Sequence, residues 1–390
     1  MKQLLKIWER SDLLDRIVSE GQAGVPDVVR PITIAGLADK APVTVVVVPR
    51  SRDAESLASA MEAWADPGDV AVFPAWEVVP GEALSPSLET MGRRIRIARD
   101  LKATPPKIII ASVRAVLQKM APPPDDSLKL AKGGTADLDE IAAALVAFGY
   151  DRNYLVERPG EFSVRGGIVD VFVPDRSHPV RIDLFGDEIS DLRQFSVSSQ
   201  RSGAPLDELE VVACRELRPG PQVAEAAKAA AQRYRDEDRA GDLEKLAQGL
   251  VFPGMESYLS VVAGPLADLT EFLPEGARVL AADPKQCRDR GSDFLTQAHE
   301  WAGDLAEGMF GSIEEIFDRT GPVELWPYAR GAGGIDLEVR GWDDFAGQVD
   351  QLAGELSRLR HQGVTIAVAA GQMAPRASEI LSEAGLGLPL

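Results

Sequence analysis

The sequence has few of the residues that build disulfide frameworks or metal centres. Its 390 residues include only two cysteines, Cys214 and Cys287, and three histidines. The cysteines lie far apart and form no CxxC pair, which excludes a disulfide framework and a thiolate zinc site. The histidines, His178, His299 and His361, lack HExxH or HxxxH spacing, so solvated or capping roles are favoured over metal binding or catalysis. We therefore expect a cytoplasmic protein without a metal site.

Long apolar runs are also missing. No run approaches the roughly 20 apolar residues that a helix needs to cross a bilayer. The N-terminal residues 1–20 carry charges throughout, so they lack the apolar core of a signal peptide and are typical of a surface helix. A membrane partner is not expected.

Basic residues are outnumbered by acidic ones. The chain has 42 Lys and Arg against 61 Asp and Glu, for a formal net charge of -19. Such a surface repels polyanions, whereas DNA-binding proteins draw most of their affinity from basic patches. One basic cluster, residues 93–99, lies on a predicted helix that Ser87 or Thr90 caps. Pairing of these arginines with nearby acids is favoured over contact with nucleic acid.

Catalytic motifs are absent as well. Residues 32–35 form a β-branched run followed by Gly36 and Lys40, which is where a phosphate loop would lie, but the pattern GxxxxGK[ST] is not there. Ala41 replaces the hydroxyl that would hold magnesium. The residues 37–42 are too few for a crossover helix before the next strand. With no GxSxG motif and only scattered carboxylate pairs, we expect no catalytic residue and no cofactor site.

The pattern that is present is typical of an α/β fold. Four short β-branched runs predict buried strands of a parallel sheet, at residues 32–35, 43–48, 70–73 and 107–111. Two helix-like segments follow, residues 51–64, with Ser51 placed to cap, and residues 112–120.

A module of different character follows a proline-rich linker. Asp137 is placed to cap a helix that runs through Ala147 and ends at Gly149. Alternating strands separated by Gly or Pro turns then predict a small antiparallel meander, at residues 161–165, 168–173, 180–185 and 189–195.

The chain then returns to the larger domain. From Glu210 it is predicted to be helical, with helices at residues 223–234 and on to 250, and residues 277–282 predict a strand of the first sheet. The meander is therefore expected to be an insertion in a larger α/β domain. Past a loop rich in Gly and Arg, three predicted elements begin a further domain: a helix at 344–360, a strand at 364–369 and a helix at 373–384.

Strand alternation suggests an exposed functional face on the meander. Arg181, Asp183 and Phe185 point away from the apolar residues of their strand, and Glu161, Ser163 and Arg165 do the same on theirs. If the two strands are neighbours, Arg165, Arg181 and Phe185 cluster on one surface, and these residue types are enriched at interfaces. The alternative, equally weighted, is that Phe185 packs under a loop and the arginines pair with Asp183 or Glu161.

Several segments resemble a known family. Residues 72–80, 84–87 and 93–101 resemble the N-terminal part of the bacterial transcription-repair coupling factors (Mfd). The segments 149–153, 160–170, 181–189 and 199–201 resemble the module that this family shares with the excision-repair protein UvrB. The similarity is strongest over residues 74–201.

The resemblance implies a fold and a site. It implies a UvrB-like α/β domain of the P-loop type, with a degenerate phosphate loop, in residues 1–130 and 203–340. An inserted UvrA-binding module would occupy residues 131–202, and a linker with the start of a third domain residues 341–390. Arg165, Arg181 and Phe185 match the UvrA-contacting positions of the family. A helix usually follows Gly36 in the family, and none is predicted here.

The resemblance also implies a function. The chain would be a UvrA-recruiting region that links stalled RNA polymerase to nucleotide excision repair, without catalysing a reaction or holding a cofactor. In the full-length family, an ATP-dependent DNA translocase, polymerase and DNA would be engaged by domains after residue 390, and the C-terminal domain would cover the UvrA-binding face. The alternative is a UvrB-like domain that itself binds nucleotide or DNA.

Overall fold

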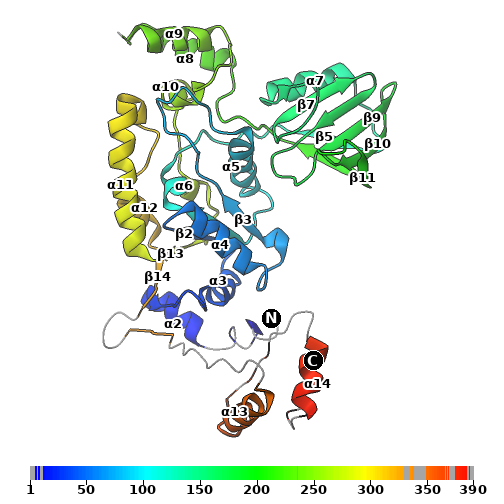
Figure 1. The fold of residues 1–390 in the computed structure, drawn as a ribbon. Helices are drawn as coiled ribbons and strands as arrows, with labels where there is room; N and C mark the ends of the chain where they lie inside the picture. Colours follow the sequence, from blue (N-terminus) through cyan, green and yellow to red (C-terminus); the bar gives the residue numbers. More distant parts are fainter. Residues whose placement is uncertain are drawn as a thin grey trace.

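A computed structural model of the chain describes most of its residues. These are residues 5–6, 8, 12–234, 236–328, 334–337, 348–364, 366, 368, 374–383 and 386. Two six-stranded sheets lie in separate parts of the molecule, and a helical extension and two C-terminal helices flank the larger sheet (Figure 1). Within the described residues, no helix is both long and apolar enough to cross a membrane.

The larger sheet is entirely parallel and contains strands from both sides of the inserted module. Its order is β1 (Gln22–Gly24), β14 (Val323–Trp326), β13 (Arg278–Ala282), β2 (Thr44–Val48), β4 (Ile108–Ser112) and β3 (Val70–Phe73). Strands β2 and β4 are buried along their whole length, which explains their continuous apolar sequences. The predicted α/β fold and the return of the chain near residue 278 are confirmed.

Helices cover both faces of this sheet. One apolar core lies beneath α2 (Leu13–Glu20), α3 (Arg30–Ala38) and α4 (Ser51–Met61). The other lies beneath α5 (Leu88–Asp100), α6 (Val113–Leu117), α11 (Pro284–Ala302) and α12 (Ile313–Thr320). This second core continues into the module, so the two parts share buried apolar residues. Short 3-10 turns lie at Pro67–Asp69, Leu269–Phe272 and Gly303–Ala306.

The prediction of a strand at residues 32–35 is wrong. These residues lie in α3, which begins after β1 and the loop 25–29. Every residue of α3 from Pro31 to Ala38 is buried. Burial on all sides removes the helical apolar stripe that would distinguish a helix from a buried strand, so the β-branched composition misled the prediction. The helix that seemed absent after Gly36 therefore exists and contains Gly36.

The cap predicted for α4 is also wrong. Arg50 occupies the cap position, and no side chain caps the helix. The Ser51 hydroxyl instead lies 3.4 Å from the hydroxyl of Ser112, within hydrogen-bond distance. The other predicted caps are confirmed, because Ser87 accepts from the Thr90 N–H and Asp137 accepts from the N–H groups of Asp139 and Glu140.

The module contains the predicted meander with one addition at each end. Its sheet has the order β11 (Ser202–Pro205), β10 (Glu188–Phe195), β9 (Val180–Phe185), β8 (Ile168–Val171), β7 (Glu161–Arg165) and β6 (Asp151–Arg152). All pairs are antiparallel except β6 with β7. Helix α7 (Leu138–Ala147) contributes Ile141 and Leu145 to the apolar core on the inner face.

A second pairing closes the base of the module. Strand β5 (Leu128–Ala131) pairs antiparallel with β12 (Glu208–Val211). The prediction that the chain becomes helical at Glu210 is therefore wrong. Glu210 lies in β12, and the next helix, α8, begins at Pro221. The partner of β12 lies some 80 residues earlier in the sequence, and local periodicity cannot report such a pairing.

The remaining elements are helical. Helices α8 (Pro221–Ala231), α9 (Glu237–Ala247) and α10 (Leu259–Val262), with a 3-10 turn at Met255–Tyr258, share an apolar core with Trp76. Helices α13 (Val349–His361) and α14 (Ala374–Glu383) bury Leu356 and Leu381 together with Leu386. Of the strand predicted at 364–369, only residues 364, 366 and 368 are described, and none of them is in a strand. Residues 329–333 of the predicted loop lie outside the described residues.

A buried ion pair joins α5 to the segment that leaves the module. The Arg94 Nε donates to Glu216 Oε1 at 2.7 Å, and both side chains are at most 1% exposed. Arg94 also donates to the carbonyls of Pro74 (3.0 Å) and Gln118 (2.9 Å) and lies over the Phe73 ring. Burial raises the pKa of Glu216 and Arg94 opposes that rise. The guanidinium thus holds together three segments of the chain that are distant in sequence.

We expect the Arg94→Ala substitution to lower the free energy of unfolding by about 3–5 kcal/mol, because it leaves the buried Glu216 carboxylate without a cation, with only the hydrogen bond from Trp76 Nε1. The neighbouring Arg93→Ala is the matched control. Arg93 is partly exposed and its nearest acid, Glu89, is 3.8 Å away, so a loss within about 0.5 kcal/mol is expected. Urea unfolding of both variants measures the difference. Equal losses would contradict the role of Arg94.

Candidate protein-docking face

Strand order decides which side chains meet on the outer face of the module. Strands β7 and β9 are not neighbours, because β8 lies between them. The predicted Arg–Phe–Arg cluster assumed that these two strands are neighbours, and this assumption is wrong. The register places Asp170 of β8 opposite Ser163 on one side and opposite Arg181 on the other. Since directly opposed residues share a face, these three form one row.

Asp170 brings the two predicted arginines together. Its Oδ2 accepts from Arg165 Nη2 at 2.6 Å and from Arg181 Nη2 at 2.9 Å, and its Oδ1 accepts from Arg181 Nε at 2.7 Å. Asp170 is 1% exposed, whereas 38% of the Arg165 side chain remains exposed. The hydrogen bond to Asp170 raises the pKa of Arg181. The arginines therefore pair with Asp170 rather than with the expected Asp183 or Glu161.

Glu161 has a local role instead. Its Oε2 accepts from the backbone N–H groups of Glu157 (2.8 Å) and Arg158 (2.9 Å) and so closes the turn before β7. Ser163 is buried, although it was expected to be exposed. It does lie in the row of Asp170 and Arg181, and a small side chain in a row with longer ones is readily covered.

Phe185 is the most exposed part of this face. It ends β9 just before the turn at Gly186 and is 82% exposed, so it does not pack under a loop. Its neighbour across the strand pair is Glu188. The ring therefore leaves most of its apolar surface open to solvent, and aromatic residues are enriched at protein interfaces.

Arg181 is held from its other side as well. Its guanidinium lies 4.8 Å from the centroid of the Phe195 ring, and Nη1 donates to the Gln200 carbonyl at 3.4 Å. Phe195 packs with Val156 and Phe172 in a small apolar cluster. The outer face thus runs from this cluster, through Asp170 and its two arginine partners, to Phe185.

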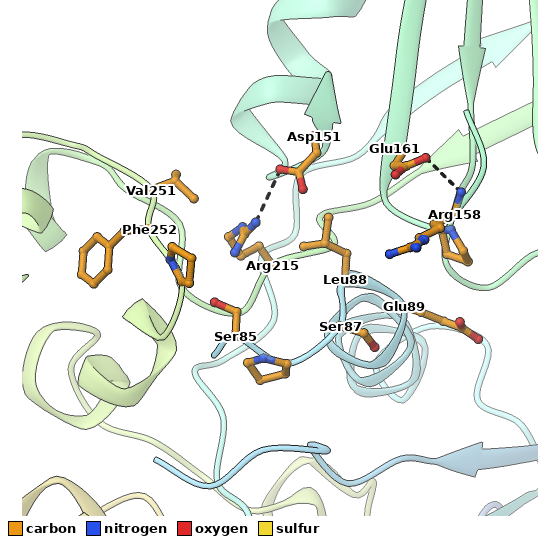
Figure 2. A pocket seen from close by; sticks show the side chains of 13 residues that line it. Ser85, Ser87, Leu88, Glu89, Asp151, Arg158, Glu161, Arg215, Val251 and Phe252 are labelled. Carbon is orange, nitrogen blue, oxygen red and sulfur yellow. Dashed lines mark hydrogen bonds and ion pairs between the residues drawn. The ribbon is translucent and has the colours of Figure 1, made fainter. Parts of the chain in front are cut away.

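A cavity of about 510 Å³ lies where the module meets the larger domain (Figure 2). Its Arg215 has internal partners, Glu256 at 2.8 Å and Asp151 at 3.5 Å. The backbone at Gly160 packs closely against Leu88 beside the cavity, because a Cβ on Gly160 would come within 2.4 Å of the Leu88 side chain. These features are typical of a structural joint rather than a ligand site.

In the structure, the loop that corresponds to a phosphate loop is residues 25–29, between β1 and α3, and not the segment around Gly36 and Lys40. There the Val25 N–H donates to the Trp326 carbonyl and the Val29 N–H to the Pro26 carbonyl. The Asp27 carboxylate pairs with Arg30 at 2.7 Å and places negative charge where a phosphate would bind. Lys40, which was considered as the phosphate-binding lysine, pairs with Asp15.

The basic cluster on α5 fastens the module rather than forming a separate surface. Arg96 donates to Asp175 and to Glu210, each at 2.9 Å, and Arg99 lies 3.1 Å from Glu210. The prediction that these arginines pair with nearby acids is confirmed. Burial raises the pKa of Glu210, but the hydrogen bonds from Arg96 and Ser127 and the charges of Arg96 and Arg99 together outweigh burial and lower the pKa to about 2.

Asp170 is the residue that the sequence interpretation missed. The signal was a single carboxylate in the apolar strand sequence Ile-Val-Asp-Val, placed on the same face as two arginines. Finding it required knowing that β8 separates β7 from β9. Among the described residues, no group of three or more His, Cys, Asp or Glu side chains is arranged to hold a metal ion.

Comparison with known proteins first identifies the module. Residues 128–217 match the UvrB interaction domain family, a range that includes β5 and β12 as well as the meander. The chain is 35% identical over 360 residues to the transcription-repair-coupling factor of Mycobacterium tuberculosis, which covers 87% of the chain. It is 24% identical over 333 residues to that of Bacillus subtilis. The predicted family is confirmed: the chain is related to the N-terminal region of the transcription-repair-coupling factors.

The match covers only part of each relative. The aligned region spans 28% of the length of the Mycobacterium tuberculosis protein and 21% of that of Myxococcus xanthus, to which the chain is 33% identical over 250 residues. The chain thus spans less than a third of the length of these relatives.

We expect the Arg96–Glu210 contact to stabilise the chain above pH 4.5 and to lose its effect as the pH falls toward about 2. The sign follows because the pKa of Glu210 is lower in the folded chain than its usual 4.5, so protonation favours the unfolded chain. Melting temperatures of the unaltered chain and of Glu210→Gln measured between pH 7 and pH 2 check this. The gap between them should close in that window, and a constant gap would contradict the expectation.

Proposed function

We propose that the outer face of the module is a docking surface for UvrA, formed by Arg165, Arg181 and Phe185. The observation that carries the proposal is the row in which Asp170 holds the two arginines beside the exposed Phe185. The match of residues 128–217 to the UvrB interaction domain family supports the choice of partner. The chain would thus recruit UvrA and link stalled RNA polymerase to nucleotide excision repair.

Docking would depend on a rigid surface that combines charged and aromatic side chains. Arginine and aromatic side chains dominate the energetics of many interfaces, and those already ordered before binding lose less entropy on association. Here strands β7, β8 and β9 hold the side chains on a regular sheet, and the apolar core on the inner face fixes that sheet. The chain as a whole repels polyanions, so a protein partner fits this surface better than DNA does.

In this proposal the region is not catalytic and acts without a cofactor. RNA polymerase and DNA would be engaged by other parts of the full-length relatives, and the C-terminal domain of those relatives would cover the docking face in the resting state. The engaged N–H groups and the Asp27 carboxylate at residues 25–29 support the absence of nucleotide binding.

We expect Arg165→Ala and Phe185→Ala each to weaken UvrA binding by roughly thirtyfold, about 2 kcal/mol, as for central residues of an interface. Arg52→Ala and Trp301→Ala are matched controls, because both residues are exposed on the larger domain and not on the module. Isothermal titration calorimetry with UvrA gives the dissociation constants. Binding by both module variants at the unaltered strength would contradict the proposal.

The alternative function, a UvrB-like nucleotide-binding domain, makes a different prediction. We expect the melting temperature of the chain to be unchanged by millimolar ATP and magnesium, because a ligand stabilises a protein only when it binds the folded state. Differential scanning fluorimetry with ATP, ADP and a no-nucleotide control measures this. A rise that depends on nucleotide concentration would favour the alternative.

A further inference from the structure

We propose that Asp170 is a positioning residue of the docking face, which orders Arg165 and Arg181 before the partner arrives. The inference rests on the proposed function, because the surface that it orders is the one assigned to UvrA. It adds a residue that itself is buried and therefore unable to contact the partner.

The first step of the argument is geometric. Asp170 lies on β8, between the strands that carry the two arginines, and each of its carboxylate oxygens is occupied by a guanidinium. Arg181 binds in a two-point arrangement through Nε and Nη2, which fixes the plane of its guanidinium. Arg165 shares Oδ2 with Arg181, so one carboxylate sets the spacing between two cations that would otherwise repel each other.

The second step concerns what else Asp170 contacts. In the described part of the chain, every hydrogen bond of the Asp170 carboxylate goes to Arg165 or Arg181, and none goes to the backbone. The strand ladder is formed by main-chain groups, and the module core lies on the opposite face, with Val169 and Val171. A carboxylate whose bonds serve only two side chains of the outer face is suited to ordering that face.

The third step concerns conformational freedom. Arginine is a long side chain with many rotamers, and a binding site built from free arginines must order them on association. Arg181 is already confined by Phe195 and Gln200, whereas Arg165 forms an ion pair only with Asp170 among the described residues. Removing the carboxylate should therefore release Arg165 more than Arg181.

The experiment compares Asp170→Asn with Asp183→Asn. Both change one carboxylate to an amide on the same face, but Asp170 holds the arginines and Asp183, on β9, forms no ion pair within the described residues. We expect Asp170→Asn to weaken UvrA binding about tenfold and Asp183→Asn to change it less than about twofold. Equal binding by Asp170→Asn and the unaltered chain would overturn the inference.

A cycle with the arginines separates positioning from a general structural effect. In the Arg165→Ala/Arg181→Ala background, we expect Asp170→Asn to cause no further loss of binding, because the side chains it acts through are gone. The same tenfold loss in that background would overturn the inference. Failure of the unaltered chain to bind UvrA would instead overturn the proposed function, and this inference with it.

A measurement on the free chain does not depend on UvrA or on the folding of a variant. NMR hydrogen exchange of the arginine Nε–H groups should show Arg181 protected relative to Arg52, whose side chain is 77% exposed and whose Nε lies 3.8 Å from Asp53, beyond hydrogen-bond distance. Exchange of Arg181 as fast as that of Arg52 would overturn the inference. Where Asp170→Asn folds, its Arg181 signal should lose this protection.

Discussion

The buried pair of Arg94 and Glu216 is the interaction on which the arrangement of the molecule depends. A charge in a protein interior is tolerated only when it is paired and hydrogen-bonded, and the Arg94 guanidinium satisfies this with one carboxylate and two carbonyls. Its partners come from the end of β3, the segment after α6 and the segment that leaves the module. The pair therefore fixes the path by which the chain exits the module and resumes the larger domain.

The module is fixed to the larger domain by a second, more exposed set of charges. Arg96 and Arg99 reach Glu210 on β12 and Asp175 after β8, while Gly92 allows close approach to Pro174. Salt bridges at the surface contribute little individually, so the shared apolar core provides most of the attachment and the charges set its geometry. The outer face of the module is therefore held in a fixed position relative to the larger domain.

Paired charges also order the outer face of the module, where Asp170 pairs with two arginines. Three charged residues on adjacent strands form a cluster in which the buried Asp170 neutralises part of the exposed Arg165 and the partly buried Arg181. Against a net charge of -19 this cluster is locally positive. At the position of a phosphate loop the opposite holds, since Asp27 adds negative charge. The Asp27 carboxylate therefore disfavours binding of a phosphate at residues 25–29.

Much of the local structure was determined by the sequence alone, because short-range periodicity and capping act within a few residues. The parallel strands after residue 43, the meander, the Asp137 cap and the outward direction of Arg165, Arg181 and Phe185 were all predictable on this basis. The helix at Arg30–Ala38 was not, since burial on every side leaves no periodic signal. The order of β7, β8 and β9 follows from the meander itself. Tertiary structure alone decided that the Asp170 carboxylate is buried and pairs with both Arg165 and Arg181, because side-chain burial and pairing depend on how the strands of the whole sheet pack together.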